Sequence, residues 1–87
     1  MVKADVYYAY LLECADGTLY AGVTTDLERR VIEHNTSPKG AKYTRARRPV
    51  VMRYYESFET MSDAAKREAE IKKYDRAAKL MLFTDKN

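Results

Sequence analysis

The sequence has little of what several protein classes require. Its one cysteine, Cys14, excludes an internal disulfide and a cysteine-cluster zinc site, and fits a reducing compartment. No apolar run approaches the roughly 18 residues of a membrane helix, and the N-terminus lacks the apolar core of a signal peptide. With only three glycines and two prolines, the composition argues against fibrous and disordered chains. We therefore expect a folded cytoplasmic protein with no membrane partner.

The remaining composition is that of a small globular domain. Of 87 residues, 46% are hydrophobic and 33% are charged, and a chain of this length has room for one modest core. We expect a single domain over residues 1–87, with its core between about residues 6 and 83. The net charge of +3 is only mildly basic, so where the charges lie matters more than how many there are.

Three segments rich in β-forming residues predict strands, at 6–13, 18–23 and 50–56. An Asp-Gly pair at 16–17 predicts a hairpin between the first two, and two registers are open. A two-residue turn would place Tyr10 and Tyr20 on opposite faces. A three-residue loop with Gly17 in the left-handed conformation would pair Tyr10 with Gly22 and place both tyrosines on one face. We favour the second, because a small Gly22 opposite Tyr10 would leave open space above the sheet.

The segment after the second strand predicts a helix over about 26–34. Thr25 and Glu28 form a capping-box pattern at its start. Helical periodicity directs Leu27 and Val31 toward the core and places Arg30 and His34 beside them, facing the protein body.

A second helix is expected to begin at Ser62, which is a good N-cap residue. Its apolar side contains Ala64 and Ile71, and Glu68 lies among them. An unpaired buried carboxylate costs several kcal/mol, so Glu68 needs a cation, a metal or a hydrogen-bond network. Pairing with Lys72, four residues on, is the simplest purely structural explanation.

A last helix over 76–83 should seal the core with residues that include Met81 and Phe83. The expected fold is therefore α/β (α+β), a small, mostly antiparallel three-stranded sheet flanked by about three helices.

The segment 35–49 reads as a loop, and basic residues without any acidic one run from Lys39 to Arg53. They interleave with Tyr43, so they could contact phosphates with charge and a stacking ring, or could form an ordinary solvated surface. The candidate nucleic-acid contacts are Lys39, Lys42, Arg45 and Arg48.

Taken together, the order and spacing of these residues resemble the GIY-YIG nuclease superfamily. Tyr8-Ala9-Tyr10 is followed after nine residues by Tyr20-Ala21-Gly22, then by Arg30 and a helical Glu68. The resemblance covers about residues 6–83 and is greatest to the small stand-alone members, which are similar to the N-terminal nuclease domain of the excision-repair endonuclease. Tyr8, Ala9 and Ala21 depart from the usual triplets, and Val23 stands where repair nucleases often carry lysine.

The resemblance implies hydrolysis of phosphodiester bonds in DNA with one divalent ion, Mg²⁺ or Mn²⁺, and no small-molecule cofactor. Glu68 would bind the metal, and Tyr10 or Tyr20 would help to deprotonate the attacking water. Arg30 would bind the phosphate, and His34 would either accept a proton or simply make a core hydrogen bond. Gly22 and Lys72 would support the site. The alternative is a nucleic-acid-binding module on the same fold without strong catalysis, which Val23 and the small basic surface favour.

Overall fold

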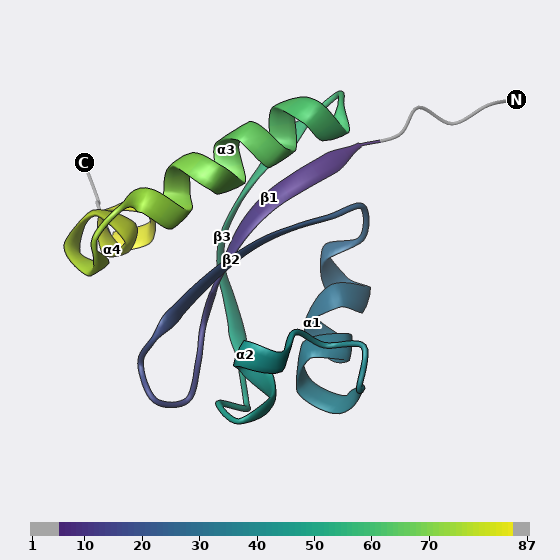
Figure 1. Ribbon diagram of the computed structural model, residues 1–87, viewed down its shortest axis with the longest axis vertical. Coiled ribbons are helices and arrows are strands. Elements are labelled where there is room, and N and C mark those ends of the chain that lie inside the picture. The colour runs from purple at the N-terminus through teal and green to yellow at the C-terminus, as the bar shows by residue number, and fades with distance from the viewer. Residues whose placement is uncertain (1–5, 85–87) are drawn as a thin grey trace, which may run out of the picture.

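The computed structural model describes residues 6–84 and shows three strands and four helices (Figure 1). In chain order these are β1 (Tyr7–Glu13), β2 (Leu19–Thr24), α1 (Leu27–Thr36), α2 (Lys42–Arg45), β3 (Val51–Phe58), α3 (Met61–Lys73) and α4 (Arg76–Thr84). The expected α+β architecture is confirmed. The short helix α2 is an addition, since it lies within the segment predicted to be a loop. Among the described residues, no helix is long and apolar enough to cross a bilayer.

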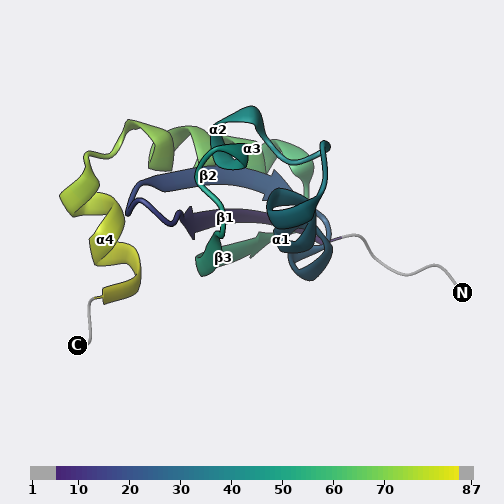
Figure 2. The same ribbon diagram turned by 90° about the horizontal axis from the view of Figure 1, so that it is seen from below.

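The sheet has the order β2-β1-β3, and both pairs are antiparallel (Figure 2). Helices α3 and α4 lie on one side of the strands, and α1 and α2 lie on the other (Figure 1). The central strand β1 is therefore covered on both faces, which explains its nearly continuous apolar sequence.

Alternation along β1 divides the core into two clusters. Leu11 packs with Ala21 and Ile71 beneath α3 and α4, whereas Leu12 and Tyr10 pack on the opposite face. Leu27 and Val31 of α1 cover this second cluster, as the helical periodicity predicted. Complete burial of a side chain such as Leu11 or Ile71 contributes about 1.5–3 kcal/mol, so both clusters matter to a domain of this size.

The β1–β2 hairpin has the three-residue loop that the sequence favoured. Tyr10 pairs with Gly22, Leu12 pairs with Tyr20, and the Cys14 amide donates to the Thr18 carbonyl at 2.8 Å. Gly17 has a φ of 85°, which an L side chain rarely adopts. Tyr10 and Tyr20 consequently share the face that packs against α1.

Both predicted helix caps were wrong by one or two residues. Asp26, not Thr25, caps α1, because its carboxylate accepts the Arg29 amide at 3.0 Å. Thr60, not Ser62, caps α3 by accepting the Asp63 amide at 3.1 Å. In each case several residues that favour the N-cap position lie close together. Tertiary packing decides at which of them the helix begins.

The prediction that Met81 seals the core was also wrong. Its side chain is 62% exposed, whereas Leu82 and Phe83 are partly buried against the Leu11 cluster. Successive helical residues differ in direction by about 100°, so a helix that directs Leu82 and Phe83 toward the sheet turns Met81 away.

Candidate active site

A buried hydrogen-bond chain connects β1, α1 and α2. The Tyr10 hydroxyl lies 2.9 Å from His34 Nε2, and His34 Nδ1 lies 2.8 Å from Thr44 Oγ1. The Thr44 hydroxyl lies 2.9 Å from the Ala41 carbonyl oxygen. His34 and Thr44 are fully buried and Tyr10 is 1% exposed, so these groups make their hydrogen bonds within the protein.

Gly22 is what allows Tyr10 to take this position. A Cβ atom at Gly22 would lie 2.4 Å from the Tyr10 hydroxyl oxygen and 2.5 Å from Cζ. The open space expected above Gly22 is therefore wrong, because the ring of Tyr10 occupies it. The pairing of Tyr10 with Gly22 was predicted and is confirmed. Its consequence is that the Tyr10 ring packs directly on the Gly22 backbone of β2.

The environment of His34 favours its neutral form. Burial first, and then the positive charges of Arg30 and Arg48, lower the pKa of the imidazole from 6.5 to about 4, against an opposing effect of Glu33. Burial also raises the pKa of the Tyr10 hydroxyl, while interaction with the Arg30 guanidinium acts in the opposite direction. At neutral pH the pair is thus an uncharged phenol beside an uncharged imidazole.

Arg30 is fixed on the flank of α1 by two hydrogen bonds. Its Nη1 donates to Glu33 Oε1 at 2.9 Å and to the Lys39 carbonyl at 3.0 Å. The side chain remains 24% exposed, so part of the guanidinium can meet a solvent-side anion. Glu33 is therefore part of the support that holds Arg30 in place.

Aromatic rings extend the site from His34 toward α2. The Tyr20 ring lies 5.5 Å from the His34 ring centroid and stacks with Tyr43 at 5.7 Å. The guanidinium of Arg47 lies 3.9 Å from the Tyr43 centroid. Tyr43 therefore links the tyrosine of β2 to a cation and has its ring engaged within the protein.

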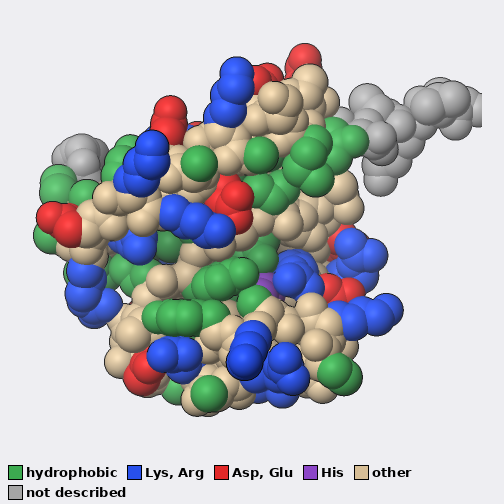
Figure 3. Space-filling model, viewed as in Figure 1, with side chains coloured by type: hydrophobic (Ala, Val, Ile, Leu, Met, Phe, Trp, Pro, Cys, Tyr) green, Lys and Arg blue, Asp and Glu red, His purple; other side chains and the backbone are tan. Residues whose placement is uncertain are grey.

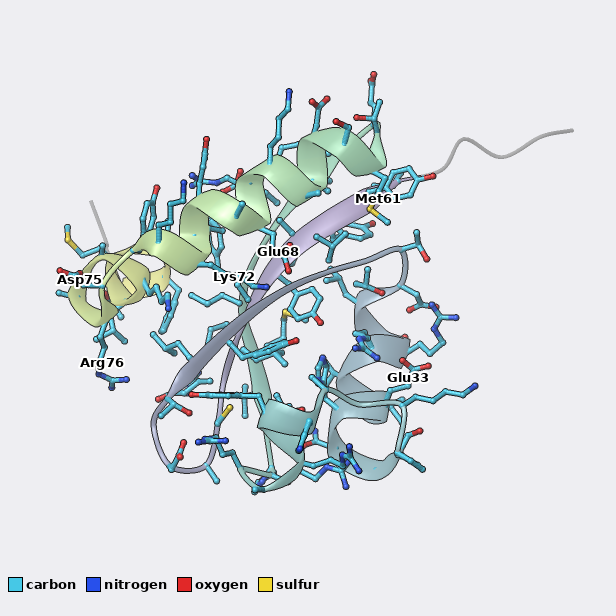
Figure 4. All side chains as sticks on the ribbon, in the orientation of Figure 1. Glu33, Met61, Glu68, Lys72, Asp75 and Arg76 are labelled. Carbon is cyan, nitrogen blue, oxygen red and sulfur yellow. The ribbon has the colours of Figure 1, made fainter. Side chains whose placement is uncertain are left out.

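Glu68 extends from α3 on the side that faces the strands, next to Lys72 (Figure 4). Lys72 Nζ lies 3.2 Å from Glu68 Oε2, and the two side chains are 55% and 24% exposed. Glu68 is therefore partly buried beside the fully buried Ala64 and Ile71, and its pairing with Lys72 is the structural explanation that the sequence offered. The Glu68 charge still raises the pKa of Tyr10, so the two groups are electrostatically coupled.

The basic residues divide into exposed and engaged groups. Lys39, Lys42 and Arg45 are exposed on the loop and α2. Arg48 instead donates to the His34 carbonyl at 2.6 Å and to the Ser37 carbonyl at 2.7 Å, at the C-terminal end of α1. Figure 3 shows Lys and Arg side chains around a band of hydrophobic side chains on this face.

A cavity of about 200 Å³ continues this basic surface toward α4. It is lined by Thr18, Leu19, Tyr43, Arg76 and Lys79. Arg76 points from α4 to the hairpin and donates to the Gly17 carbonyl (Figure 4). The lining contains two cations and no carboxylate, so it is suited to an anionic group.

Two contributors to the site were not among the sequence candidates. Thr44 is fully buried in a segment read as a basic loop, where nothing in the local pattern indicates burial. Gly40 is the second, because a Cβ there would lie 2.7 Å from the Glu33 carbonyl oxygen. The glycine lets the loop approach α1 closely and so places Thr44 against His34. A glycine in a segment otherwise rich in basic residues was the only available signal.

A resident metal centre made by the protein alone is not present in the described part of the chain. No group of three or more His, Cys, Asp and Glu side chains comes together between residues 6 and 84. Glu68 offers one partly exposed carboxylate with Lys72 as its partner. Such a donor fits a hard divalent cation that completes its coordination with substrate phosphates and water.

The GIY-YIG catalytic domain model matches residues 6–81. The chain belongs to the GIY-YIG family. Its relatives include the UPF0213 protein of Staphylococcus saprophyticus, which is 49% identical over 93% of this chain and 98% of that protein. The UPF0213 protein of Halobacterium salinarum is 53% identical over 90% of this chain and 100% of that protein. The predicted membership among small members of the GIY-YIG family is thereby confirmed.

A solved structure agrees with the fold. The solution NMR structure of the UPF0213 protein BH0048 from Bacillus halodurans is similar with a TM-score of 0.58 and 42% identity, covering 93% of this chain and 85% of that one. Family membership makes this GIY-YIG chain a nuclease-type domain, a hydrolase by its fold family.

Proposed function

We propose that this GIY-YIG domain hydrolyses phosphodiester bonds in DNA with the help of one divalent cation. The observation that carries the proposal is the Tyr10–His34 hydrogen bond of 2.9 Å, which gives a weakly basic phenol a partner for its proton. Arg30 and Glu68 both act on the pKa of Tyr10, so a phosphate ligand and a metal ligand belong to the same electrostatic unit.

The proposed chemistry is a proton relay from water through Tyr10. As the water oxygen attacks phosphorus, its proton passes to the Tyr10 oxygen while the hydroxyl proton of Tyr10 passes to His34 Nε2. Because Tyr10 is only 1% exposed, the attacking water must come into contact with a nearly buried hydroxyl oxygen. Tyr20 is half-buried on the same face and packs against the cluster that contains Tyr10.

Arg30 and Glu68 would stabilise the charge that develops on the phosphate. The exposed part of the Arg30 guanidinium can donate to phosphoryl oxygens, a geometry for which the planar guanidinium is suited. Glu68 is the residue that would hold Mg²⁺ or Mn²⁺, and a bound ion would polarise a phosphoryl oxygen as a Lewis acid. Lys72 would keep the Glu68 carboxylate oriented before the metal and substrate arrive.

The second candidate is a nucleic-acid-binding module with weak or no catalysis. The near-complete burial of Tyr10 and His34 favours it, because a buried relay can serve as a structural hydrogen bond alone. The two candidates differ in one measurable property, which is turnover of DNA in the presence of a divalent metal.

The proposed function is tested by offering the wild-type protein branched, nicked, flapped and single-stranded DNA with Mg²⁺, with Mn²⁺ or with a chelator. Metal-dependent strand scission of at least one structure supports the nuclease. Binding without scission under every condition would support the binding module. We propose DNA repair or recombination as the setting, in line with the resemblance to the nuclease domain of the excision-repair endonuclease.

Nucleic-acid affinity is predicted to depend on exposed lysine and arginine of α2. Replacing both Lys42 and Arg45 with alanine should make the negative slope of log K against log salt concentration shallower by about 2. The reason is that two phosphate contacts no longer release counterions. Fluorescence anisotropy titrations at several salt concentrations measure this slope.

The matched control for this titration replaces Lys66 and Lys73 with alanine. Both lysines are exposed on α3, and their replacement removes the same amount of charge. Equal slopes for the two double variants would show that α2 is an ordinary solvated surface. Arg48 is left unchanged, because its bonds to the end of α1 make an alanine variant structurally ambiguous.

A further inference from the structure

We propose that Thr44 is a positioning residue that fixes the tautomer of His34, so that His34 Nε2 always presents a lone pair to Tyr10. This inference rests on the proposed function for its catalytic consequence, but the tautomer itself is a property of the free protein. It follows from counting the hydrogens and acceptors along one buried chain of side chains.

The contact between Thr44 and Ala41, at one end of this series of hydrogen bonds, sets the donor-to-acceptor direction of the series. The Ala41 carbonyl oxygen has no hydrogen, so across the 2.9 Å contact the Thr44 hydroxyl must be the donor. A hydroxyl has one hydrogen, and once it is directed to Ala41 the Thr44 oxygen can only accept from His34. The 2.8 Å contact is then a hydrogen bond from His34 Nδ1–H to Thr44 Oγ1.

The near end of the chain agrees with this direction. With the proton on Nδ1, neutral His34 has an unprotonated Nε2, which accepts the Tyr10 hydroxyl at 2.9 Å. In the reversed arrangement Nε2–H would donate to the Tyr10 oxygen. The Tyr10 hydroxyl hydrogen would then have no acceptor among the described residues, at a side chain that is 1% exposed. A buried donor without a partner is unfavourable, so the forward direction is selected.

Burial of every member keeps the chain in this one arrangement. His34 and Thr44 are fully buried, so water cannot replace either partner without opening the fold. The position of Thr44 depends in turn on α2 and on the close approach of Gly40 to α1. The loop that carries the basic residues is therefore also the element that prepares the proton acceptor.

The consequence for the reaction is a relay with a fixed sense. The Tyr10 O–H bond breaks and an Nε2–H bond forms, and the tyrosine oxygen regains a proton from the attacking water. Throughout, Nδ1–H stays bonded to Thr44, so the positive charge that forms on the imidazole keeps a hydrogen-bond acceptor. With the other tautomer, Nε2 would already hold a hydrogen and the relay could not begin.

The test uses the whole protein and two substitutions of Thr44. Thr44→Val keeps the shape and removes the hydroxyl, whereas Thr44→Ser keeps the hydroxyl and serves as the matched control. Nitrogen-15 NMR of the His34 ring at neutral pH distinguishes protonated from unprotonated ring nitrogens, without DNA or metal. We expect Nδ1–H in the wild type and in Thr44→Ser. In Thr44→Val each tautomer leaves one buried donor without an acceptor, so we expect a mixture in which a measurable share of His34 carries Nε2–H.

The kinetic arm measures single-turnover cleavage and DNA affinity for the same proteins. Thr44→Val should lose about 10-fold or more in cleavage rate with DNA affinity unchanged, and Thr44→Ser should recover most of that loss. An Nε2–H tautomer in the wild type would overturn the inference, as would a Thr44→Val protein that keeps only Nδ1–H. If Thr44→Val does not fold, the wild-type spectrum still decides. If no DNA is cut, the spectrum stands and the proposed nuclease function alone fails.

Discussion

Replacing Glu68 with glutamine is expected to reduce metal-dependent cleavage by about 100-fold or more while leaving folding almost unchanged. A metal-bound phosphoryl oxygen gains several kcal/mol of transition-state stabilisation, and each 1.4 kcal/mol corresponds to about tenfold in rate. Glutamine preserves the shape of the side chain but is a poor ligand for Mg²⁺. Cleavage under single-turnover conditions with Mg²⁺ is the measurement.

Thermal unfolding of the same Glu68→Gln variant provides the structural control. The partner Lys72 is 55% exposed, and an ion pair of this kind contributes at most about 1 kcal/mol. Glu70→Gln is the matched variant, because Glu70 lies on the same helix, pairs with Arg67 and is 62% exposed. A large loss of stability in Glu68→Gln with an unchanged cleavage rate would make Glu68 a structural residue.

The stability of the protein should fall by about 2 kcal/mol between about pH 7.5 and 5.0 because of His34 alone. Its folded-state pKa of about 4 lies below the value of 6.5 in the unfolded chain. Between those values the unfolded chain binds a proton that the folded protein does not, so stability is complete above about pH 6.5. Below it, each pH unit costs about 1.4 kcal/mol until the folded pKa is reached.

Urea unfolding at the two pH values measures this difference, with His34→Gln as the control. The variant is expected to be less stable at every pH, because two buried hydrogen bonds change, but its stability should be nearly constant over this range. Glu33 and Asp16 have lowered pKa values through bonds to Arg30 and Thr18, and they act only below about pH 4.5. Equal pH dependence in wild type and variant would show that His34 does not remain neutral in the fold.

The parts of the site that could be predicted are those that local periodicity determines. The Asp-Gly pair and the two-residue period of strands limited the hairpin to two registers, and the favoured one, with Tyr10 opposite Gly22, is confirmed although the open space that favoured it is filled by the Tyr10 ring. The direction of Arg30 and His34 followed from the helical period, measured against Leu27 and Val31. Both inferences use residues that are close together in the sequence.

The remaining features of the site depend on tertiary contacts that no local sequence pattern indicates. Thr44 meets His34 only because Gly40 brings the loop close to α1, and no repeating pattern marks that approach. Glu68 is 24% exposed rather than fully buried, and this degree of burial depends on how Ala64 and Ile71 of the same helix pack on the sheet. Arg48 was expected to contact phosphate because it is an arginine in a basic segment. It instead donates hydrogen bonds to main-chain carbonyl oxygens at the end of α1.

The central claim is that Tyr10 transfers the proton of the attacking water to His34. Single-turnover cleavage by Tyr10→Phe tests it most directly, because phenylalanine fills the space over Gly22 and lacks only the hydroxyl. Loss of a general base typically reduces the rate by about 100-fold or more, so we expect that reduction with DNA affinity close to wild type. Thermal stability should fall by about 1–3 kcal/mol, because buried His34 Nε2 loses its hydrogen-bond partner. Metal-dependent cleavage by Tyr10→Phe at the wild-type rate would contradict the account.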